Sequence, residues 1–219
     1  MVNYSSSEEN YLKAIYHLQV EGGKATTNAL AAALQSRPAS ITDMTKKLSA
    51  KGLLDYTPYY GFSLSSEGRK VALLIIRRHR LWEYFLADKL GFSWEEVHTV
   101  AEELEHVSSK KLIDKLDEYL GFPQFDPHGD PIPDKKGRLT SAEQLSLAKL
   151  PLNCPSKIIQ VTNQSPIMLE ELKQQQIAIG TQILVKRSSS FDGTLHVLIK
   201  NKPATISSQL AQHLFVKRL

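Results

Sequence analysis

Apolar residues recur at every third or fourth position through long stretches of the first half of the chain, which is the spacing of amphipathic helices. The longest run covers residues 66–90, and Gly91 follows it at a position where glycine commonly ends a helix. Ser93 and Glu96 have the spacing of a capping box, so a further helix is predicted to begin there. Two consecutive helices are therefore expected in the middle of the chain.

Three shorter helical patterns precede this pair. The first follows a capping signal at residues 6–9, the second begins at Thr27, and the third covers residues 38–52. The tight bend at residues 36–37 is typical of a helix-turn-helix motif, whose second helix enters the major groove of DNA. Residues 53–64 then read as two short strands around a turn. A winged helix-turn-helix is predicted, although three helices and a hairpin also occur in small folds without this function.

The last third of the chain is typical of a small β domain. Short apolar or alternating runs at residues 157–161, 182–185 and 196–199 predict strands, and residues 207–213 predict one short helix. The proline-containing stretch 141–155 before them reads as a linker with a short helical piece. The fold class expected for the whole chain is α+β and mainly helical.

The composition indicates in which cellular compartment the protein is expected. The chain has 219 residues, 42% of them hydrophobic, and no apolar run long enough for a membrane span. Its polar N-terminus does not resemble a signal peptide. The single cysteine, Cys154, excludes a disulfide framework and a zinc site built from thiolates. A cytoplasmic protein that does not bind a membrane is expected.

The net charge of +4 is unevenly distributed. Residues 1–72 carry eight Lys or Arg and six acidic residues, whereas residues 73–150 carry eleven and fourteen, and residues 151–219 carry eight and three. A basic N-terminal part followed by an acidic central part is consistent with a nucleic-acid-binding domain joined to a cation-binding domain.

The two central helices carry the candidate metal ligands. On one helix His98, Glu102, Glu105 and His106 fall at i, i+4, i+7 and i+8, which places them on a single polar stripe without Lys or Arg. On the other, His79 and Glu83 are four residues apart. Nitrogen and oxygen donors in this number favour a divalent transition metal over solvated, charge-rich helix faces. The His-Glu-x-x-His signature of metalloproteases is absent, so neither an enzyme nor a small organic substrate is expected.

The third helix offers a DNA-binding surface opposite its apolar side. Short polar residues near its start suit base edges, and lysines further along suit phosphates. Together with two residues of the preceding bend, the candidate contacts are Arg37, Ala39, Ser40, Thr42, Asp43, Lys46 and Lys47.

Several motifs of residues 1–140 together resemble the diphtheria-toxin-repressor family of metal-dependent bacterial transcription repressors. They are Glu-Asn-Tyr-Leu-Lys-Ala-Ile-Tyr from residue 9, Arg-Pro-Ala-Ser from 37, Lys-Gly-Leu-Leu from 51, Arg-His-Arg-Leu-Trp-Glu from 78, Glu-x-x-Glu-His from 102 and Asp-Pro-His-Gly-Asp-Pro-Ile-Pro from 126. The resemblance implies a winged-helix DNA-binding domain over 1–72, a helical dimerisation and metal domain over 73–140, a linker over 141–155 and an SH3-like barrel over 156–219.

The resemblance also implies two metal sites. Glu102, Glu105 and His106 match the primary, activating site. The positions that match the ancillary site are His79, Glu83 and His98, to which longer manganese-responsive relatives add those of Asp126 and His128. His128 could instead be a turn residue. The barrel can lend ligands in such relatives, and the available oxygen donors are Asn163, Gln164 and Glu170.

Three positions depart from or vary within the family pattern. Asn10 stands where relatives supply methionine or aspartate to the primary site, so either its neutral carbonyl oxygen or Glu9 would complete that site. Lys13 stands where short manganese sensors have a carboxylate, which argues against their two-metal arrangement. Glu102 replaces the cysteine of iron-sensing members. A site built only from nitrogen and oxygen favours Mn²⁺, with Fe²⁺ as the alternative.

These features predict a metal-activated repressor that binds a double-stranded, palindromic DNA operator as a homodimer and controls metal homeostasis genes. Several of the apolar residues Leu81, Trp82, Phe85 and Leu86 are expected to pack across the dimer interface, the alternative being burial under the C-terminal domain. Two alternatives remain open at this point: a metal-independent DNA-binding protein whose ligand cluster is structural, and a metalloenzyme, which would need an open coordination position and a base.

Overall fold

The computed structural model describes residues 4–20, 22–57, 61–107, 109–139, 145–163 and 165–219. They form two compact units. The first contains residues 1–82, 101–122 and 132–140, and the second contains residues 83–100, 123–131 and 141–219. The division into three domains expected from the sequence stays a prediction.

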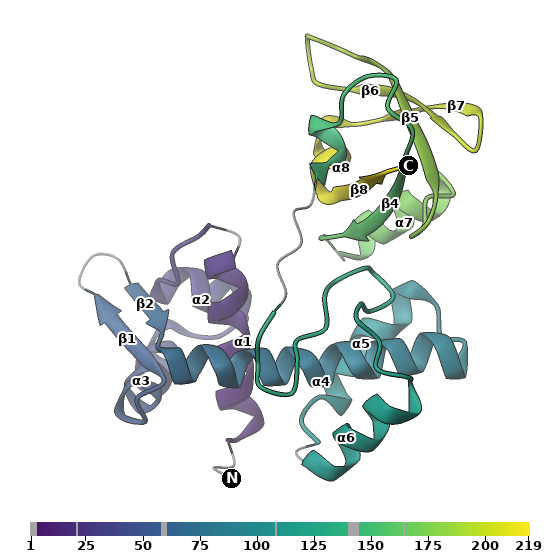
Figure 1. The fold of residues 1–219 in the computed structure, drawn as a ribbon. Helices are drawn as coiled ribbons and strands as arrows, with labels where there is room; N and C mark the ends of the chain where they lie inside the picture. The colour runs from purple at the N-terminus through teal and green to yellow at the C-terminus, as the bar shows by residue number, and fades with distance from the viewer. Residues whose placement is uncertain (1–3, 21, 58–60, 108, 140–144, 164) are drawn as a thin grey trace. The chain divides into compact units, whose positions relative to one another are not determined.

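The first unit begins with the winged helix-turn-helix expected from the sequence. Figure 1 shows its three helices and its hairpin gathered around the start of the long helix α4. The elements are α1 (Ser6–Val20), α2 (Thr27–Ala33), α3 (Pro38–Ala50), β1 (Leu54–Thr57) and β2 (Gly61–Leu64), the two strands pairing antiparallel. Residues 58–60 of the predicted wing turn lie outside the described residues.

Local sequence explains where these helices begin. The Thr26 hydroxyl accepts a hydrogen bond from the Ala29 amide at the start of α2, and Pro38 occupies the first turn of α3, where its missing N–H costs nothing. The helices share one apolar core, whose fully buried members include Leu12, Ile15, Leu30, Ile41 and Leu48. This core fixes α1 against α3.

Helix α4 (Ser66–Leu90) is followed by α5 (Trp94–Leu104) and α6 (Lys110–Tyr119). The predicted capping box opens α5, where the Glu96 carboxylate accepts hydrogen bonds from the amide and hydroxyl of Ser93. The expectation that one helix carries the whole polar stripe is wrong at its end. Helix α5 stops at Leu104, and Glu105 and His106 lie in the turn that follows. Helix α6 was not anticipated, because its apolar positions are interrupted by charged residues.

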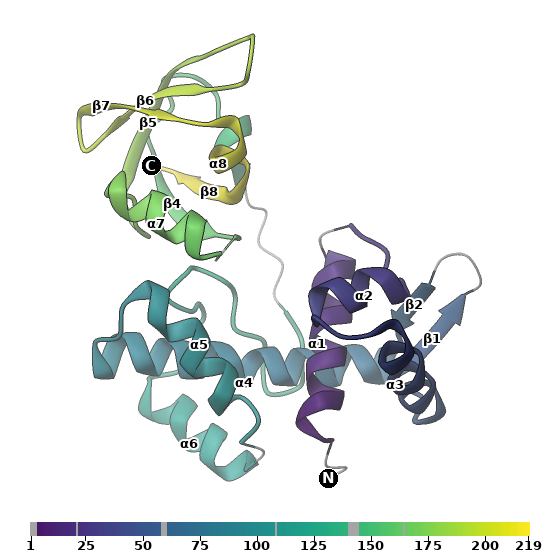
Figure 2. The same ribbon diagram turned by 180° about the vertical axis from the view of Figure 1, so that it is seen from behind.

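The second unit contains an antiparallel six-stranded sheet in the order β3-β8-β4-β5-β6-β7. Figure 2 shows its strands curving around one another, with the labelled helices α7 and α8 beside them. The strands are β3 (Leu145–Ser146), β4 (Ser156–Val161), β5 (Gln182–Ser188), β6 (Leu195–Ile199), β7 (Lys202–Ile206) and β8 (Leu214–Arg218), and the helices are η1 (Leu147–Lys149), α7 (Pro166–Gln174) and α8 (Ser208–His213). The three predicted strands and the predicted helix are all present.

Strands β7 and β8 and helix α7 were missed, because their apolar runs are short and flanked by lysine, proline or glutamate. Strand β3 lies inside the stretch predicted as linker, and the adjacent Leu147 is fully buried in the barrel core. The barrel therefore begins before residue 156.

The apolar residues expected at a dimer interface divide into two kinds. Leu81 and Leu86 are buried within the single chain. Trp82 and Phe85 are only partly buried. No helix in the described part of the chain is both long enough and apolar enough to cross a membrane.

Candidate metal centre

Within the first unit, α4 and α5 bring three candidate ligands together. His79 projects from α4, Glu102 from the last turn of α5, and Glu105 from the turn just after it. Their ligand atoms lie within 4.8 Å of one another. We call these residues, with His106 and the α1 residues Glu9, Asn10 and Lys13, the first cluster.

Glu105 is at the centre of the first cluster and is fully buried. Its Oε2 lies 2.7 Å from Nδ1 of His79. Burial by itself raises the pKa of Glu105, but the contacts with His79 and Lys13 outweigh burial and hold that pKa below its ordinary value. An ionised carboxylate is thus kept in a buried position, which is the form that binds a metal.

Helix α1 places a cation between the two carboxylates. Nζ of Lys13 donates to Oε1 of Glu102 at 2.5 Å, and to Oε1 and Oε2 of Glu105 at 2.6 and 2.8 Å. Sequence reasoning singled out Lys13 only as a departure from the family pattern. In the structure it supplies the positive charge that two neighbouring carboxylates require.

His106 faces α1 instead of entering the group formed by His79, Glu102 and Glu105. Its Nδ1 lies 2.8 Å from Oε2 of Glu9, and its Nε2 lies 3.9 Å from Oε1 of Glu105. Glu9 also accepts a hydrogen bond from Nη2 of Arg78 at 2.6 Å. The Arg78 Nε in turn donates to the backbone carbonyl of Glu105 at 2.6 Å. Glu9 therefore connects α1 to both the ligand turn and α4.

Asn10 has the feature expected of a ligand. Its Oδ1 is buried and has no hydrogen-bond partner among the residues that the structure describes. It also lines the same cavity of about 340 Å³ as Lys13 and Glu102. Because a buried carbonyl oxygen without a partner is costly, a cation in this cavity would satisfy it. The three carboxylates, two imidazoles and one amide oxygen of the first cluster fit Mn²⁺ or Fe²⁺ by donor chemistry.

A second cluster lies in the second unit. Glu83, Asp126 and His128 are all buried, and their ligand atoms lie within 4.8 Å of one another. His98 adds its Nδ1 at 3.3 Å from Oε1 of Glu83. The sequence had grouped His98 with Glu83 as well. His79, which was assigned to the same ancillary site, has its Nδ1 2.7 Å from Oε2 of Glu105 in the first unit.

The loop that carries Asp126 and His128 is held by its own backbone. Oδ1 of Asp126 accepts hydrogen bonds from the amides of His128 and Asp130, at 2.8 and 2.9 Å. Both ring nitrogens of His128 lack a hydrogen-bond partner in the described structure, and its ring lies 5.5 Å from that of Trp94. Burial lowers the pKa of His128, which favours the neutral imidazole that metals bind.

Strand β4 of the barrel packs directly against this loop. The Val161 amide donates to the carbonyl of His128 at 2.9 Å, and Gly129 approaches the strand so closely that a Cβ would meet the Ile159 carbonyl oxygen. Gln160 donates from Nε2 to Asp130, while its Oε1 is buried without a hydrogen-bond partner within the described ranges. Gln160 is thus a further candidate oxygen donor.

Sequence reasoning missed Gln160 and named other oxygen donors of the barrel. Asn163 already accepts a hydrogen bond from Ser165 through its Oδ1, and Glu170 is exposed and pairs with Gln174. Gln164 lies outside the described residues. The signal that could have found Gln160 is a polar residue inside the apolar run of β4.

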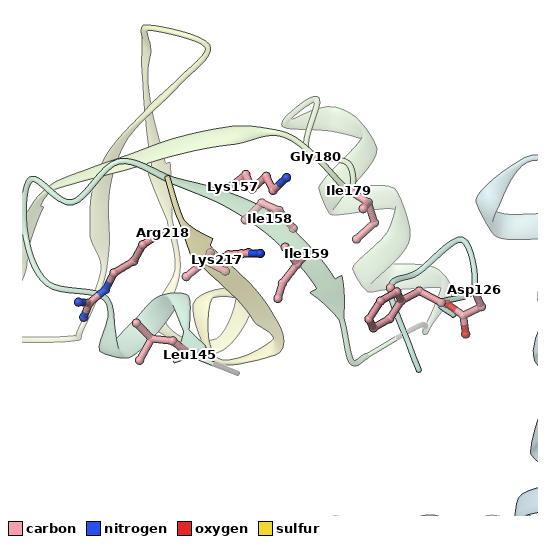
Figure 3. A pocket seen from close by; sticks show the side chains of 12 residues that line it. Asp126, Leu145, Lys157, Ile158, Ile159, Ile179, Gly180, Lys217 and Arg218 are labelled. Carbon is pink, nitrogen blue, oxygen red and sulfur yellow. The ribbon is translucent and has the colours of Figure 1, made fainter. Parts of the chain in front are cut away.

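A cavity of about 1040 Å³ adjoins the same loop in the second unit. Figure 3 shows it between Asp126 on one side and Arg218 on the other, with β4 residues Lys157 and Ile159 along it. Of the candidate metal ligands only Asp126 lines this space. The second cluster therefore meets the cavity at Asp126.

The recognition helix α3 displays most of the predicted DNA contacts. Ile41, Thr45 and Leu48 are buried on its inner side. The exposed candidates are Arg37, Ala39, Ser40, Asp43, Lys46 and Lys47. Thr42 is partly buried, and its hydroxyl donates to the carbonyl of Pro38 at 3.1 Å, which leaves only its acceptor capacity for a base edge.

Comparisons with known families match almost the whole chain. Residues 3–62 match the family described as iron dependent repressor, N-terminal DNA binding domain. Residues 65–134 match the iron dependent repressor, metal binding and dimerisation domain. Residues 145–218 match the FeoA domain.

Similar proteins agree with these matches. The chain is 27% identical over 224 residues to the iron-dependent repressor IdeR of Mycobacterium leprae, covering 96% of both chains. It is 36% identical over 116 residues to the HTH-type transcriptional regulator MntR of Oceanobacillus iheyensis, covering 53% of this chain and 78% of that one. A solved manganese-dependent transcriptional repressor in complex with manganese is similar over 97% of this chain and 100% of its own, with 33% identity and a TM-score of 0.85.

Proposed function

Because this chain belongs to the family of iron- and manganese-dependent transcriptional repressors, we propose that a metal ion in the first cluster activates it to bind operator DNA as a homodimer. Members of this family are transcription regulators and not enzymes. The observation that carries the proposal is the buried, ionised Glu105, which has ligand-type side chains from α1, α4 and α5 around it.

The residues proposed to hold the activating ion are Glu102, Glu105, His106 and Asn10, with His79 beside them. When bound, the ion would supply a double positive charge that draws these ligands together. Asn10 supports this role through its unpaired Oδ1, and His106 through its contact with α1 by way of Glu9. The ligands come from α1 and from the end of α5, so their closure would bias the position of α1. An ion acts in this way only if it binds the DNA-competent arrangement more tightly.

Lys13 restricts how the first cluster can be filled. Its ammonium lies against both carboxylates, where it does the electrostatic work of a cation in the metal-free protein. A second ion bridging Glu102 and Glu105 would have to occupy the same region as this ammonium. We therefore propose a single activating ion, with Lys13 turning partly aside when the ion binds.

Mn²⁺ is the proposed effector, with Fe²⁺ as the alternative. All donors of the first cluster are nitrogen or oxygen, with Glu102 at the position where the family resemblance implies a cysteine in iron-sensing members. Hard oxygen donors suit Mn²⁺. Similar proteins are named after either metal, so the donor set is the basis of this choice.

The second cluster is proposed as the ancillary site. Glu83, His98, Asp126 and His128 supply its donors, and Gln160 is added from the barrel. The support is the neutral, buried imidazole of His128 and the buried oxygen of Gln160, both without hydrogen-bond partners in the part of the chain described. Because Gln160 and His128 come from the barrel and from the preceding loop, an ion there would hold the barrel against that loop.

DNA contact is proposed for the exposed side of α3. Ser40 and Asp43 would reach base edges, while Lys46 and Lys47 would bind phosphates. In a homodimer the two recognition helices would bind half-sites about one helical turn of DNA apart. An operator with two-fold symmetry follows from this arrangement.

The test is binding of the full chain to a duplex from the region upstream of its own gene. Fluorescence anisotropy would be measured with Mn²⁺, with Fe²⁺ under anaerobic conditions, and with a chelator, at one fixed salt concentration. Tight, sequence-specific binding only with metal is expected. Equal binding with the chelator would favour a metal-independent DNA-binding protein.

A further inference from the structure

Glu8, in the first turn of α1, joins this helix to the recognition helix α3. Its Oε1 lies 2.5 Å from Nζ of Lys51 and 3.1 Å from Nζ of Lys47. Lys47 is in the last turn of α3, and Lys51 is the residue that caps it. Glu8 itself is almost completely buried, so these two ion pairs fix the junction between the helices.

The neighbouring carboxylate holds the opposite side of α1. Glu9 contacts Nδ1 of His106 at 2.8 Å and Nη2 of Arg78 at 2.6 Å. Asn10, the next residue, offers its unpaired oxygen to the first cluster. Three consecutive residues within one helical turn therefore attach α1 to the recognition helix and to the metal ligands. A shift of α1 at Asn10 would move Glu8 as well, since a turn of helix is only about 5.4 Å long.

A structural role alone would explain part of this arrangement. Glu8 and Ser5 form a capping box, in which the Ser5 amide donates to Oε2 of Glu8 at 3.0 Å and the Glu8 amide lies 3.3 Å from the Ser5 hydroxyl. The cap uses only Oε2, and a glutamine could provide it. The two lysine contacts at Oε1 are additional to the cap and go to the helix that would bind DNA.

We propose that Glu8 is a positioning residue that transmits metal occupancy from α1 to the recognition helix. The inference rests on the proposed function, because it assigns a path to the metal-dependent step. Glu8 holds Lys47 and the end of α3 in a fixed relation to α1, so closure of the first cluster sets the angle of α3. The quantity that Glu8 controls is the coupling between metal and DNA, which is the ratio of operator affinities with and without Mn²⁺.

The experiment compares Glu8→Gln, Lys51→Gln and the double variant with the full-length protein. Glu8→Gln keeps the acceptor for the Ser5 amide and removes the charge. In both single variants we expect the coupling ratio to fall about 10-fold, within the usual range of coupling energies. The double variant should lose no more than Glu8→Gln alone, because that single change already removes the ion pair between Glu8 and Lys51. Glu67→Gln is the matched control, since its exposed carboxylate pairs loosely with Lys70 on α4.

Mn²⁺ affinity is measured in parallel, by paramagnetic resonance of the free ion. Without DNA it should be unchanged in Glu8→Gln, whereas the gain in Mn²⁺ affinity caused by operator DNA should shrink by the same factor as the coupling ratio. This reciprocity separates a positioning role from damage to the metal ligands.

Other outcomes would overturn the inference. Tighter DNA binding by Glu8→Gln, to an equal extent with and without Mn²⁺, would mean that Glu8 merely withholds Lys47 from phosphates. A lower melting temperature with an unchanged coupling ratio would mean that Glu8 has only a structural role at the start of α1. If the wild-type protein itself bound DNA without metal dependence, the proposed function would fail first.

Discussion

The two candidate metal clusters differ in how their buried polar groups are partnered. In the first cluster, the carboxylates of Glu102 and Glu105 have a cation of their own in Lys13. In the second, His128 is buried as a neutral ring whose nitrogens have no hydrogen-bond partner among the described residues. The first cluster thus contains its own compensating cation, whereas in the second cluster a carboxylate oxygen of Glu83 lies 3.9 Å from Nδ1 of His128.

This difference suggests different responses to metal. An ion entering the first cluster competes with an ammonium, so its binding involves a rearrangement around α1 and is suited to a switch. An ion entering the second cluster satisfies atoms that are already in place, so its binding is suited to holding the barrel against the loop at residues 126–130. The two clusters should therefore respond differently to substitution of their ligands.

The largest effect is expected from Glu105→Gln. The substitution keeps the shape of the side chain but removes the charge that Lys13, His79 and the metal all require. We expect metal-activated operator binding to fall at least about 100-fold at saturating Mn²⁺, which is the upper range of allosteric coupling. Anisotropy with operator DNA measures the loss. Glu103→Gln, two residues away on the exposed side of α5, is the control. Wild-type activation by the Glu105 variant would remove the first cluster from the mechanism.

The second prediction concerns His79, whose Nδ1 lies 2.7 Å from Glu105. We expect His79→Ala to weaken operator binding about 10-fold even at saturating Mn²⁺, because the loss of a residue that orients a ligand typically has this size of effect. Its family position implies instead a change in the Mn²⁺ concentration required, with full binding at saturation. A Mn²⁺ titration of operator binding distinguishes these results, and the second outcome would return His79 to the ancillary site.

His79 also illustrates what sequence can and cannot establish. Glu102 is in the last turn of α5 and Glu105 follows that helix directly, so their closeness along the chain was sufficient to bring them together. Contact between His79 and Glu105 depends on how α4 and α5 pack, and spacing along the chain carries no information on that crossing. The family resemblance found the residues, but the neighbours of each came from the structure.

Lys13 and Gln160 show the same limit in the two clusters. Lys13 was visible as a lysine where relatives have a carboxylate, yet its three short contacts require α1 to lie against α5. Gln160 was hidden inside an apolar strand pattern, which predicted β4 correctly and concealed its polar member. Most of the helices and three strands of the barrel were readable because they have clear apolar periodicity. The remaining strands are short and lack it.

The third prediction breaks the charge compensation of the first cluster. Lys13→Met leaves Glu105 buried without its ammonium partner, so the metal-free protein should melt at a lower temperature. Mn²⁺ should bind about 10-fold more tightly, because the ion no longer has to displace an ammonium. A change of this size lies within the usual range of coupling between two binding events. Calorimetry of Mn²⁺ binding and thermal melting with a chelator provide both values. Lys111→Met, at an exposed position of α6, is the control. Unchanged Mn²⁺ affinity would show that Lys13 does not compete with the ion.

The fourth prediction addresses the second cluster. His128→Ala removes a buried donor without touching the first cluster. We expect the Mn²⁺ concentration for half-maximal operator binding to rise about 5-fold, at the low end of coupling effects, while binding at saturation stays at the wild-type level. His196→Ala, at an exposed position of β6, is the matched control. Loss of binding at saturating Mn²⁺ would mean that the second cluster is itself the activating site, and the contrast between the two clusters would be reversed.

The smallest change is expected from Asn10→Asp, which adds one negative charge to the first cluster. A carboxylate at this position places a negative oxygen where a neutral one lies buried, and a hard cation prefers the charged donor. Lys13 lines the same cavity and would also be attracted to the new charge, which offsets part of the gain. We therefore expect activation at only about 3-fold lower Mn²⁺ concentration, less than typical coupling effects. Asn10→Leu, which removes the oxygen, should shift the requirement the other way. If both variants titrate like the wild type, α1 does not donate a ligand through residue 10, and Glu9 becomes the candidate that connects α1 to the ion.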